Sequence, residues 1–312
     1  MLSAWVLALA TVAGCGGGGG GSSSGPGFGG TQTGVWAYTG AGTAVRFDLA
    51  SGNETSLALS PQSQQNLGYG GATFTDVDEQ RFTTSRPNEY TVNLRNSSPA
   101  PFSIRSSLPP IKLTGGHVSG PVQTSPDAAL FAVHTIESAG LGLPDLDYVT
   151  LIDANILVQW RLVGYRDPVW LGSDRVLVVG DDGLFAVTAV PSPTLTRIGL
   201  PIAQPSRPSV SPDGKSIAFV QGDITWRIGT DGTGKTQLTQ ASSGQTWPAW
   251  SPDGTKLAIV KGDCPPVGGG VPDPTVVVVS ANTPNQDLSQ AVTVARIGGA
   301  PVRTCGPVYW LP

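Results

Sequence analysis

The chain has 312 residues, of which 18 are basic and 22 are acidic, so its formal net charge is −4. This balance argues against a nucleic-acid surface, which needs a basic excess, and we expect no nucleic-acid partner. Charged residues make up only 13% of the chain, whereas 42 glycines and 27 prolines are present. Such a composition is typical of short β-strands joined by many turns.

Residues 1–14 are predicted to be a lipoprotein signal peptide. The apolar run 4–10 is too short to span a bilayer as a mature helix, and it leads into a Val-Ala-Gly-Cys sequence that ends at Cys15. This tetrapeptide resembles the bacterial lipobox, although no Lys or Arg precedes it. The resemblance implies cleavage, lipidation of Cys15 and anchoring in the cell envelope, on the periplasmic face of the outer membrane in a Gram-negative cell. The alternative is a buried helix with a chance cysteine.

Residues 15–32 are then the lipidated cysteine and a flexible linker, because six glycines follow Cys15 and a serine-rich stretch comes next. Such a tether lets a soluble domain stand off the membrane. The remaining residues, 33–312, are predicted to form a single domain.

A repeat of about 40 residues runs through this domain. Ser-Pro-Asp-Gly followed by a β-rich strand occurs twice, forty residues apart, and a third copy lacks the glycine. In such a turn, proline presets φ, aspartate bonds the backbone and glycine takes φ > 0. A period near 40 with several strands in each unit is typical of a β-propeller. The turn residues are Ser125, Pro126, Asp127, Ser211, Pro212, Asp213, Gly214, Ser251, Pro252, Asp253 and Gly254.

A specific resemblance lies within residues 120–260. Ser-Pro-Asp-Gly, an Ile-Ala-Phe strand, the Asp-Gly-Thr-Gly-Lys turn at 231–235 and the Leu-Thr pair at 238–239 together resemble the TolB-like, WD-repeat-related propellers. The resemblance implies an all-β fold and protein contacts in the envelope. The separate N-terminal α/β domain of TolB itself has no counterpart among the predicted elements, so the partners of TolB do not carry over.

We expect six four-stranded blades, with seven as the alternative. Five blades are predicted to begin near residues 72, 120, 167, 207 and 247. The sixth is divided between the two ends of the domain, because the strand at 307–310 lacks following strands and the N-terminal part of the domain can supply them. Pairing of the C-terminal strand with the N-terminal strands would close the propeller and remove its edge.

Two catalytic motifs occur in places that do not suit them. The segment 229–236 matches the nucleotide P-loop, but no helical pattern follows it, so a hairpin turn is the interpretation and no nucleotide is expected. The Gly-Ser-Ser-Ser-Gly sequence at 21–25 matches the hydrolase elbow inside a low-complexity linker. His117 and His134 have no accompanying nucleophile motif, and His134 is placed at a strand end. No catalytic residue is therefore assigned.

The sequence contains no cluster of ligands for zinc, and no cofactor is expected. Acidic residues gather at 76–79, 145–147 and 181–182, in segments predicted to be turns. Because a propeller collects loops at one mouth, a Ca²⁺ ion bound in the channel is the one metal alternative.

Cys264 and Cys305 are the only cysteines after Cys15. An even pair in an exported chain indicates a disulfide, with two free thiols as the alternative. Cys264 opens a proline- and glycine-rich insertion, and Cys305 directly precedes the segment predicted to close the propeller. A bridge would hold that insertion against the closure.

Most tryptophans occupy strand positions that recur in the repeats. Packing within and between blades is their expected role. The alternative is that a few of them line a mouth of the propeller as binding hot spots. The set consists of Trp36, Trp170, Trp226, Trp250 and Trp310.

These features favour a membrane-anchored, monomeric module of the cell envelope that binds a protein partner or acts as a scaffold without catalysis. One alternative is an envelope polysaccharide lyase or hydrolase, which would need histidine and carboxylates converging at one mouth. Another is a carbohydrate-binding module that uses the same mouth.

Overall fold

Short runs of β-branched residues, such as the four valines at 276–279, are separated by glycine, proline and aspartate, so the chain favours strands and turns. The computed structural model describes residues 34–38, 43–49, 53–58, 72–74, 81–86, 89–94, 102–105, 117–118, 123–125, 130–137, 143–153, 158–189, 192–263, 274–295, 299–304 and 306–311. In these ranges every regular element except short turns is a strand. None of them contains a helix with the length and apolar character needed to cross a membrane.

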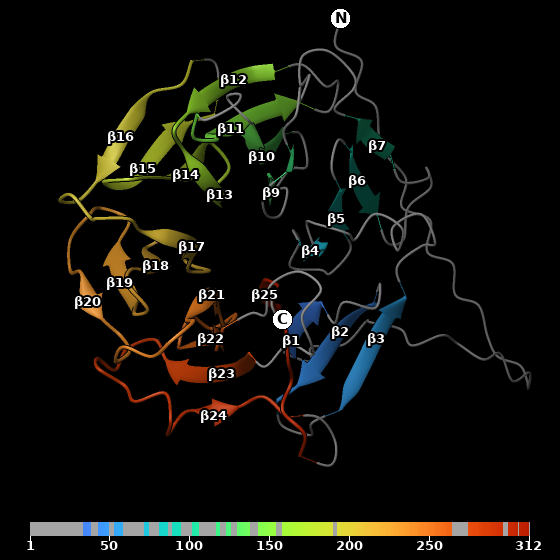
Figure 1. The fold of residues 1–312 in the computed structure, drawn as a ribbon, viewed down its shortest axis with the longest axis vertical. Coiled ribbons are helices and arrows are strands. Elements are labelled where there is room, and N and C mark those ends of the chain that lie inside the picture. The colour runs from blue at the N-terminus through green and yellow to red at the C-terminus, as the bar shows by residue number, and fades with distance from the viewer. Residues whose placement is uncertain are drawn as a thin grey trace, which may run out of the picture. The chain divides into compact units, whose positions relative to one another are not determined.

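The strands pair in antiparallel sheets (Figure 1). The terminal sheet has the order β25-β1-β2-β3 and consists of β1 (Gly34–Tyr38), β2 (Thr43–Asp48), β3 (Glu54–Ala58) and β25 (Val308–Leu311). The β4–β7 sheet consists of β4 (Ala72–Phe74), β5 (Arg81–Arg86), β6 (Glu89–Leu94) and β7 (Phe102–Arg105). The β8–β12 sheet consists of β8 (His117–Val118), β9 (Gln123–Thr124), β10 (Leu130–Glu137), β11 (Leu146–Asp153) and β12 (Val158–Val163).

Three further sheets follow in chain order, and each pairs its strands in sequence. The β13–β16 sheet consists of β13 (Arg166–Leu171), β14 (Arg175–Gly180), β15 (Gly183–Thr188) and β16 (Leu195–Ile198). The β17–β20 sheet consists of β17 (Ser206–Val210), β18 (Ser216–Val220), β19 (Thr225–Gly229) and β20 (Thr236–Gln237). The β21–β24 sheet consists of β21 (Thr246–Trp250), β22 (Lys256–Lys261), β23 (Thr275–Ser280) and β24 (Val292–Thr293).

Successive sheets contact each other through their first strands. β13 contacts β17, β17 contacts β21, and β21 contacts β25 of the terminal sheet. In that terminal sheet β25 pairs with β1, so that Val35 lies opposite Trp310 and Ala37 lies opposite Val308. The number of blades and the closure of the propeller nevertheless stay predictions.

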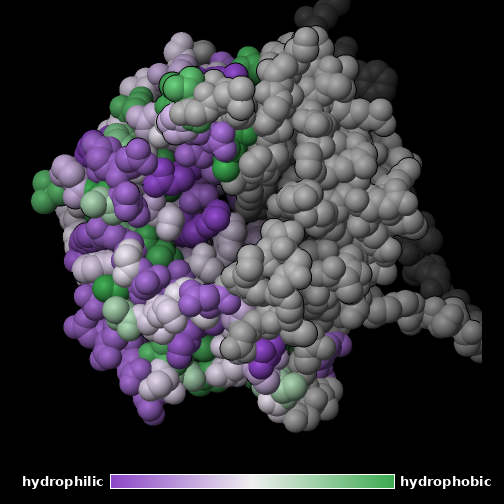
Figure 2. Space-filling model, viewed as in Figure 1, coloured by the Kyte–Doolittle hydropathy of each residue, from purple (hydrophilic) through white to green (hydrophobic). Residues whose placement is uncertain are grey.

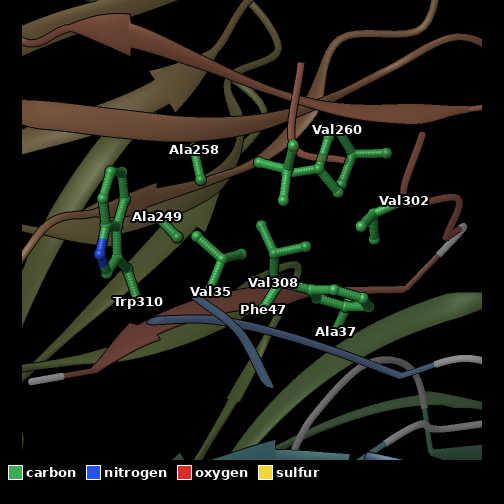
Figure 3. Packing of buried hydrophobic residues seen from close by; sticks show 11 residues of the cluster. Val35, Ala37, Phe47, Ala249, Ala258, Val260, Val302, Val308 and Trp310 are labelled. Carbon is green, nitrogen blue, oxygen red and sulfur yellow. The ribbon is translucent and has the colours of Figure 1, made fainter. Parts of the chain in front are cut away.

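The hydrophobic core is divided into clusters that lie between neighbouring sheets. One cluster joins the terminal sheet to the β21–β24 sheet, and Figure 3 shows side chains from both sheets pointing toward one another. Since burying a side chain such as Val or Phe contributes about 1.5–3 kcal/mol, each cluster stabilises one junction between sheets. The labelled members of this cluster are Val35, Ala37, Phe47, Ala249, Ala258, Val260, Val302, Val308 and Trp310.

Two tryptophans add a hydrogen bond to these junctions. The indole Nε1 of Trp170 donates to the carbonyl of Gln123 on β9, and that of Trp250 donates to the carbonyl of Ser209 on β17. Each acceptor belongs to the sheet that precedes the tryptophan in the chain. These two side chains therefore hold adjacent sheets together, which agrees with the packing role expected for them.

Candidate functional site

A recurring backbone irregularity positions three side chains at the start of the first strands. Asp167, Arg207 and Trp247 are forty residues apart, each is followed by proline, and their φ angles are 47°, 49° and 50°. The pairing with the next strand shifts register at each of these points. A positive φ at a residue other than glycine costs about 1–3 kcal/mol. Bulges of this kind change the direction of side chains. Three costly copies therefore indicate that the positions of these three side chains matter to the protein.

The three side chains contact one another in order and are called here the inner-strand row. Asp167 accepts hydrogen bonds from the backbone N–H of Arg207 and from its Nη1, both at 2.9 Å. The guanidinium of Arg207 lies over the Trp247 ring, 4.1 Å from the ring centroid. Asp167 is 9% exposed, Arg207 is 31% exposed and Trp247 is half-buried. The row is thus anchored at a buried carboxylate and reaches solvent through the Arg207–Trp247 stack.

A histidine extends this arrangement into the β8–β12 sheet. His134 lies nine residues after the serine of its repeat turn, and the two Ser-Pro-Asp-Gly repeats carry buried Val220 and Val260 at the same place. His134 is itself only 4% exposed. A polar ring therefore replaces the apolar side chain that two other sheets have at this position, and burying such a ring is costly unless it is hydrogen-bonded.

The His134 ring meets carboxylates on both of its nitrogen sides. Its Nε2 lies 2.7 Å from Oδ1 of Asp147, and its Nδ1 lies 4.0 Å from Oδ1 of Asp167. Since an ionised carboxylate only accepts hydrogen bonds, Nε2 is protonated and donates to Asp147. The buried Nδ1 has no hydrogen-bond partner. The hydrogen bond from His134 holds the pKa of Asp147 below its ordinary value. Partial burial opposes this effect, and the attraction of Arg166 and of a protonated His134 adds to it.

Two ion pairs lie beside the row, at the turn between β14 and β15. Arg166 donates through Nη1 to Asp181 at 2.8 Å and through Nη2 to the carbonyl of Pro205. Arg197 pairs with Asp182. On the side of the molecule seen in Figure 2, hydrophilic residues predominate among the described ones and hydrophobic residues are scattered. This side therefore offers polar and charged contacts rather than a broad apolar patch.

These positions correct two expectations from the sequence. His134 was expected at a strand end, but it lies inside β10, paired with Val149 of β11. Asp147 was expected in a turn, but it belongs to β11 and accepts the hydrogen bond from His134. The sequence could not reveal this contact because it depends on the register between two strands.

The two complete Ser-Pro-Asp-Gly turns lie after β17 and β21, away from the row. In each turn the serine hydroxyl donates to the aspartate two residues later. The glycines of both turns, Gly214 and Gly254, have a φ of 69°. The hydrogen bonds and the positive φ are those expected from the turn chemistry.

The third copy of the turn is described only in part. Ser125 is buried, and its hydroxyl accepts a hydrogen bond from the backbone N–H of Leu130. Pro126 and Asp127 lie outside the described residues.

The structure describes some of the remaining candidate residues from the sequence, and others lie outside the described residues. The P-loop-like segment joins β19 to β20 as a hairpin turn, closed by a hydrogen bond from the Gly229 N–H to the carbonyl of Thr233. His117 belongs to β8, and its side chain is not among those described. The acidic residues at 76–79 lie outside the described residues, as do Cys15, Cys264 and Cys305.

The described residues of the site include types that are suited to binding. Within the described part of the chain, no group of three or more His, Cys, Asp or Glu residues could hold a metal ion. The Nδ1 atom of His134 is hydrogen-bonded to no hydroxyl or thiol of a described residue, so this histidine has no nucleophile to activate there. Arg and Trp, by contrast, are among the residue types most enriched at binding hot spots.

Comparisons with known proteins place this geometry in a fold class. A protein described as TolB from Agrobacterium tumefaciens aligns with 90% of this chain and 99% of its own, at a TM-score of 0.54 and 15% identity. TolB from Acinetobacter baumannii aligns with 90% of this chain at a TM-score of 0.54 and 13% identity, and the match spans 66% of that protein. The chain has a TolB-like β-propeller fold.

A functionally unknown protein from Desulfotomaculum acetoxidans is also similar, with a TM-score of 0.50, 11% identity and coverage of 89% of this chain and all of its own. No family model matches the sequence, and no curated protein matches it either. At these identities the TolB-like likeness speaks for the fold alone.

The inner-strand row has a sequence signal that repeat counting alone does not show. The prolines at 168, 208 and 248 mark the 40-residue period, and each follows a charged or aromatic residue. Those preceding residues are the members of the row. Their mutual contacts, however, depend on how the sheets pack.

Proposed function

We propose that this protein is a binding or scaffold module of the cell envelope that recognises a protein partner through the inner-strand row and performs no catalysis. The observation that carries the proposal is the Arg207–Trp247 stack, in which two hydrogen bonds to Asp167 hold Arg207 in place. A guanidinium held in this way keeps donors on its exposed side and loses little side-chain entropy when a partner binds. The resemblance of residues 120–260 to TolB-like propellers implies the same class of function.

The proposed location of the module in the cell follows from its N-terminal sequence. Lipidation of Cys15 would anchor the chain to an envelope membrane, and the glycine-rich linker would let the row reach a partner. Six blades closed by β25, and a disulfide between Cys264 and Cys305, complete the proposal. Thiol titration of the folded, unreduced protein tests the bridge: reactive sulfurs at both positions would exclude it.

The enzymatic alternative, a lyase or hydrolase, draws on His134 with its two neighbouring carboxylates. Those carboxylates lie at opposite nitrogens of a ring that is 4% exposed. A paired-carboxylate mechanism needs both groups to face the substrate. The arrangement therefore gives the enzymatic alternative little support.

Site-specific photocrosslinking in intact envelopes tests the proposal. A photoreactive side chain replaces Trp247 in one variant and Lys215 in the matched control, which is exposed on the turn after β17. We expect a discrete crosslinked protein from position 247 and none from position 215, and we expect Arg207→Ala to weaken the product. Equal products from both positions, or glycan turnover without any crosslink, would contradict the proposal.

A further inference from the structure

The two nitrogens of the His134 ring make unequal contacts. Nε2 donates to Asp147 at 2.7 Å, whereas the buried Nδ1 has no hydrogen-bond partner and faces Oδ1 of Asp167 at 4.0 Å. Most buried polar atoms of proteins are hydrogen-bonded, so a nitrogen without a partner 4.0 Å from a carboxylate calls for an explanation.

The number of protons on the imidazole ring explains the unpaired nitrogen. A neutral imidazole has a single N–H. When that N–H is on Nε2 and donates to Asp147, Nδ1 has only a lone pair, and its neighbour Asp167 is also an acceptor. A metal ion between Nδ1 and Asp167 is not supported, because no group of three or more His, Cys, Asp or Glu among the described residues could hold one. Binding of one proton converts Nδ1 into a donor aimed at Asp167.

We propose that His134 is a proton-operated switch of the inner-strand row, in which protonation of Nδ1 transfers part of the Asp167 carboxylate from Arg207 to His134. The consequence for a partner rests on the proposed function, whereas the switch itself is a property of the isolated protein. Histidine is the side chain that proteins ordinarily use for such a switch.

The coupling to Arg207 follows from the shared oxygen. Oδ1 of Asp167 accepts from Nη1 of Arg207 at 2.9 Å and faces Nδ1 of His134, while Oδ2 accepts from the Arg207 backbone. A charge-assisted bond needs about 2.7–2.9 Å, so the carboxylate must move toward β10. The bond from the Arg207 backbone to Oδ2 is retained, so the movement of Oδ1 falls on the Nη1 contact and on the stack over Trp247.

The charged groups around His134 come from several strands. Asp147 on β11 keeps its hydrogen bond in both protonation states, Asp167 and Arg166 lie on β13, and Arg207 lies on β17. On the other side, β8 pairs with β10, and the side chain of its His117 is not among those described. Among the described residues, these groups are two carboxylates and two arginines, and a proton on His134 adds one positive charge to them.

Nitrogen NMR of the isolated protein tests the switch. In a His117→Gln background, His134 is the only histidine, so its Nδ1 and Nε2 signals are assigned without ambiguity. As the pH falls from about 8 to 5, we expect Nδ1 to shift from the value of an acceptor nitrogen to that of an N–H. The indole signal of Trp247 should move with the same midpoint, because its stacking partner is displaced.

Two variants separate the switch from a general pH response. His134→Val introduces the residue that Val220 and Val260 supply at the equivalent positions, so the fold should tolerate it. Asp167→Asn keeps the shape and removes the charge. Both should abolish the pH-dependent movement of the Trp247 signal, and if Asp167→Asn does not fold, His134→Val decides.

Two results would overturn the switch. One is an Nδ1 that stays bare throughout the pH range, and the other is a movement of the Trp247 signal that survives in His134→Val. Neither result bears on whether the row binds a partner, which the crosslinking experiment decides.

Discussion

Asp167 and Arg207, forty residues apart in the chain, are joined across two sheets by a pair of 2.9 Å hydrogen bonds, one to the backbone N–H and one to the guanidinium. The first bond fixes where the Arg207 backbone lies, and the second fixes where its side chain points. Together they explain how a strained backbone at a positive φ is maintained at this place.

Replacement of Asp167 by alanine should destabilise the protein. Asp167 is 9% exposed, and its loss leaves Arg207 without two hydrogen bonds. Bonds that involve a charged group contribute about 1.5–3 kcal/mol, and we expect a loss of at least that size in urea unfolding. The control is Asp181→Ala, because Asp181 is 89% exposed and its pair with Arg166 should contribute only about 0–1 kcal/mol. Equal losses in the two variants would contradict the anchoring role of Asp167.

Replacement of Gln245 by leucine should also be costly. Its buried Oε1 accepts hydrogen bonds from the Thr225 backbone and from the hydroxyls of Thr225 and Thr239, and its Nε2 donates to two carbonyls. Leaving a buried polar group unsatisfied costs about 1–3 kcal/mol, and several groups are affected. Gln240→Leu is the control, since its exposed side-chain amide donates to the carbonyl of Asn285 at the surface. Thermal unfolding should show a large loss of stability for Gln245→Leu alone, and similar melting of both variants would argue against the network.

Acid should remove the contribution of Asp147. Its pKa is lowered in the folded protein, chiefly by the hydrogen bond from His134. A carboxylate with a depressed folded pKa stabilises the protein above its unfolded pKa of about 3.9, and that contribution is lost as the pH falls through the folded value. The difference in unfolding free energy between wild type and Asp147→Asn should therefore shrink below about pH 4. A difference that stays constant from neutral pH down to acid unfolding would show that this ion pair contributes nothing.

Glycine at position 232 should tolerate alanine less well than glycine at position 214. Both have a positive φ, 84° and 69°, so alanine at either is strained by about 1–2 kcal/mol. At Gly232 an added Cβ would also overlap the backbone of Gly199 in the neighbouring sheet, whereas at Gly214 it meets nothing within 4 Å. Chemical unfolding should give the larger loss for Gly232→Ala. The reverse order would mean that the two sheets are not in close contact there.

The features that sequence alone made accessible are local. Ser-Pro-Asp-Gly carries its own turn chemistry, and the 40-residue period led to the TolB-like propeller fold that the solved structures support. The site is different, because the contact between Asp167 and Arg207 depends on how two sheets pack. His134 was equally hidden, since a strand register brings it to Asp147 and a neighbouring sheet brings it to Asp167. Sequence spacing contains no direct information on such contacts.

The most direct measurement of the central claim is the affinity of the crosslinked partner, once purified, for three forms of the protein. Wild type is compared with Trp247→Ala and with Lys215→Ala, the control on the turn after β17. Hot-spot residues cost about 2 kcal/mol or more when truncated, so Trp247→Ala should weaken binding by about 30-fold or more. Lys215→Ala should bind as wild type does. Unchanged affinity in Trp247→Ala would show that the inner-strand row is not the contact surface.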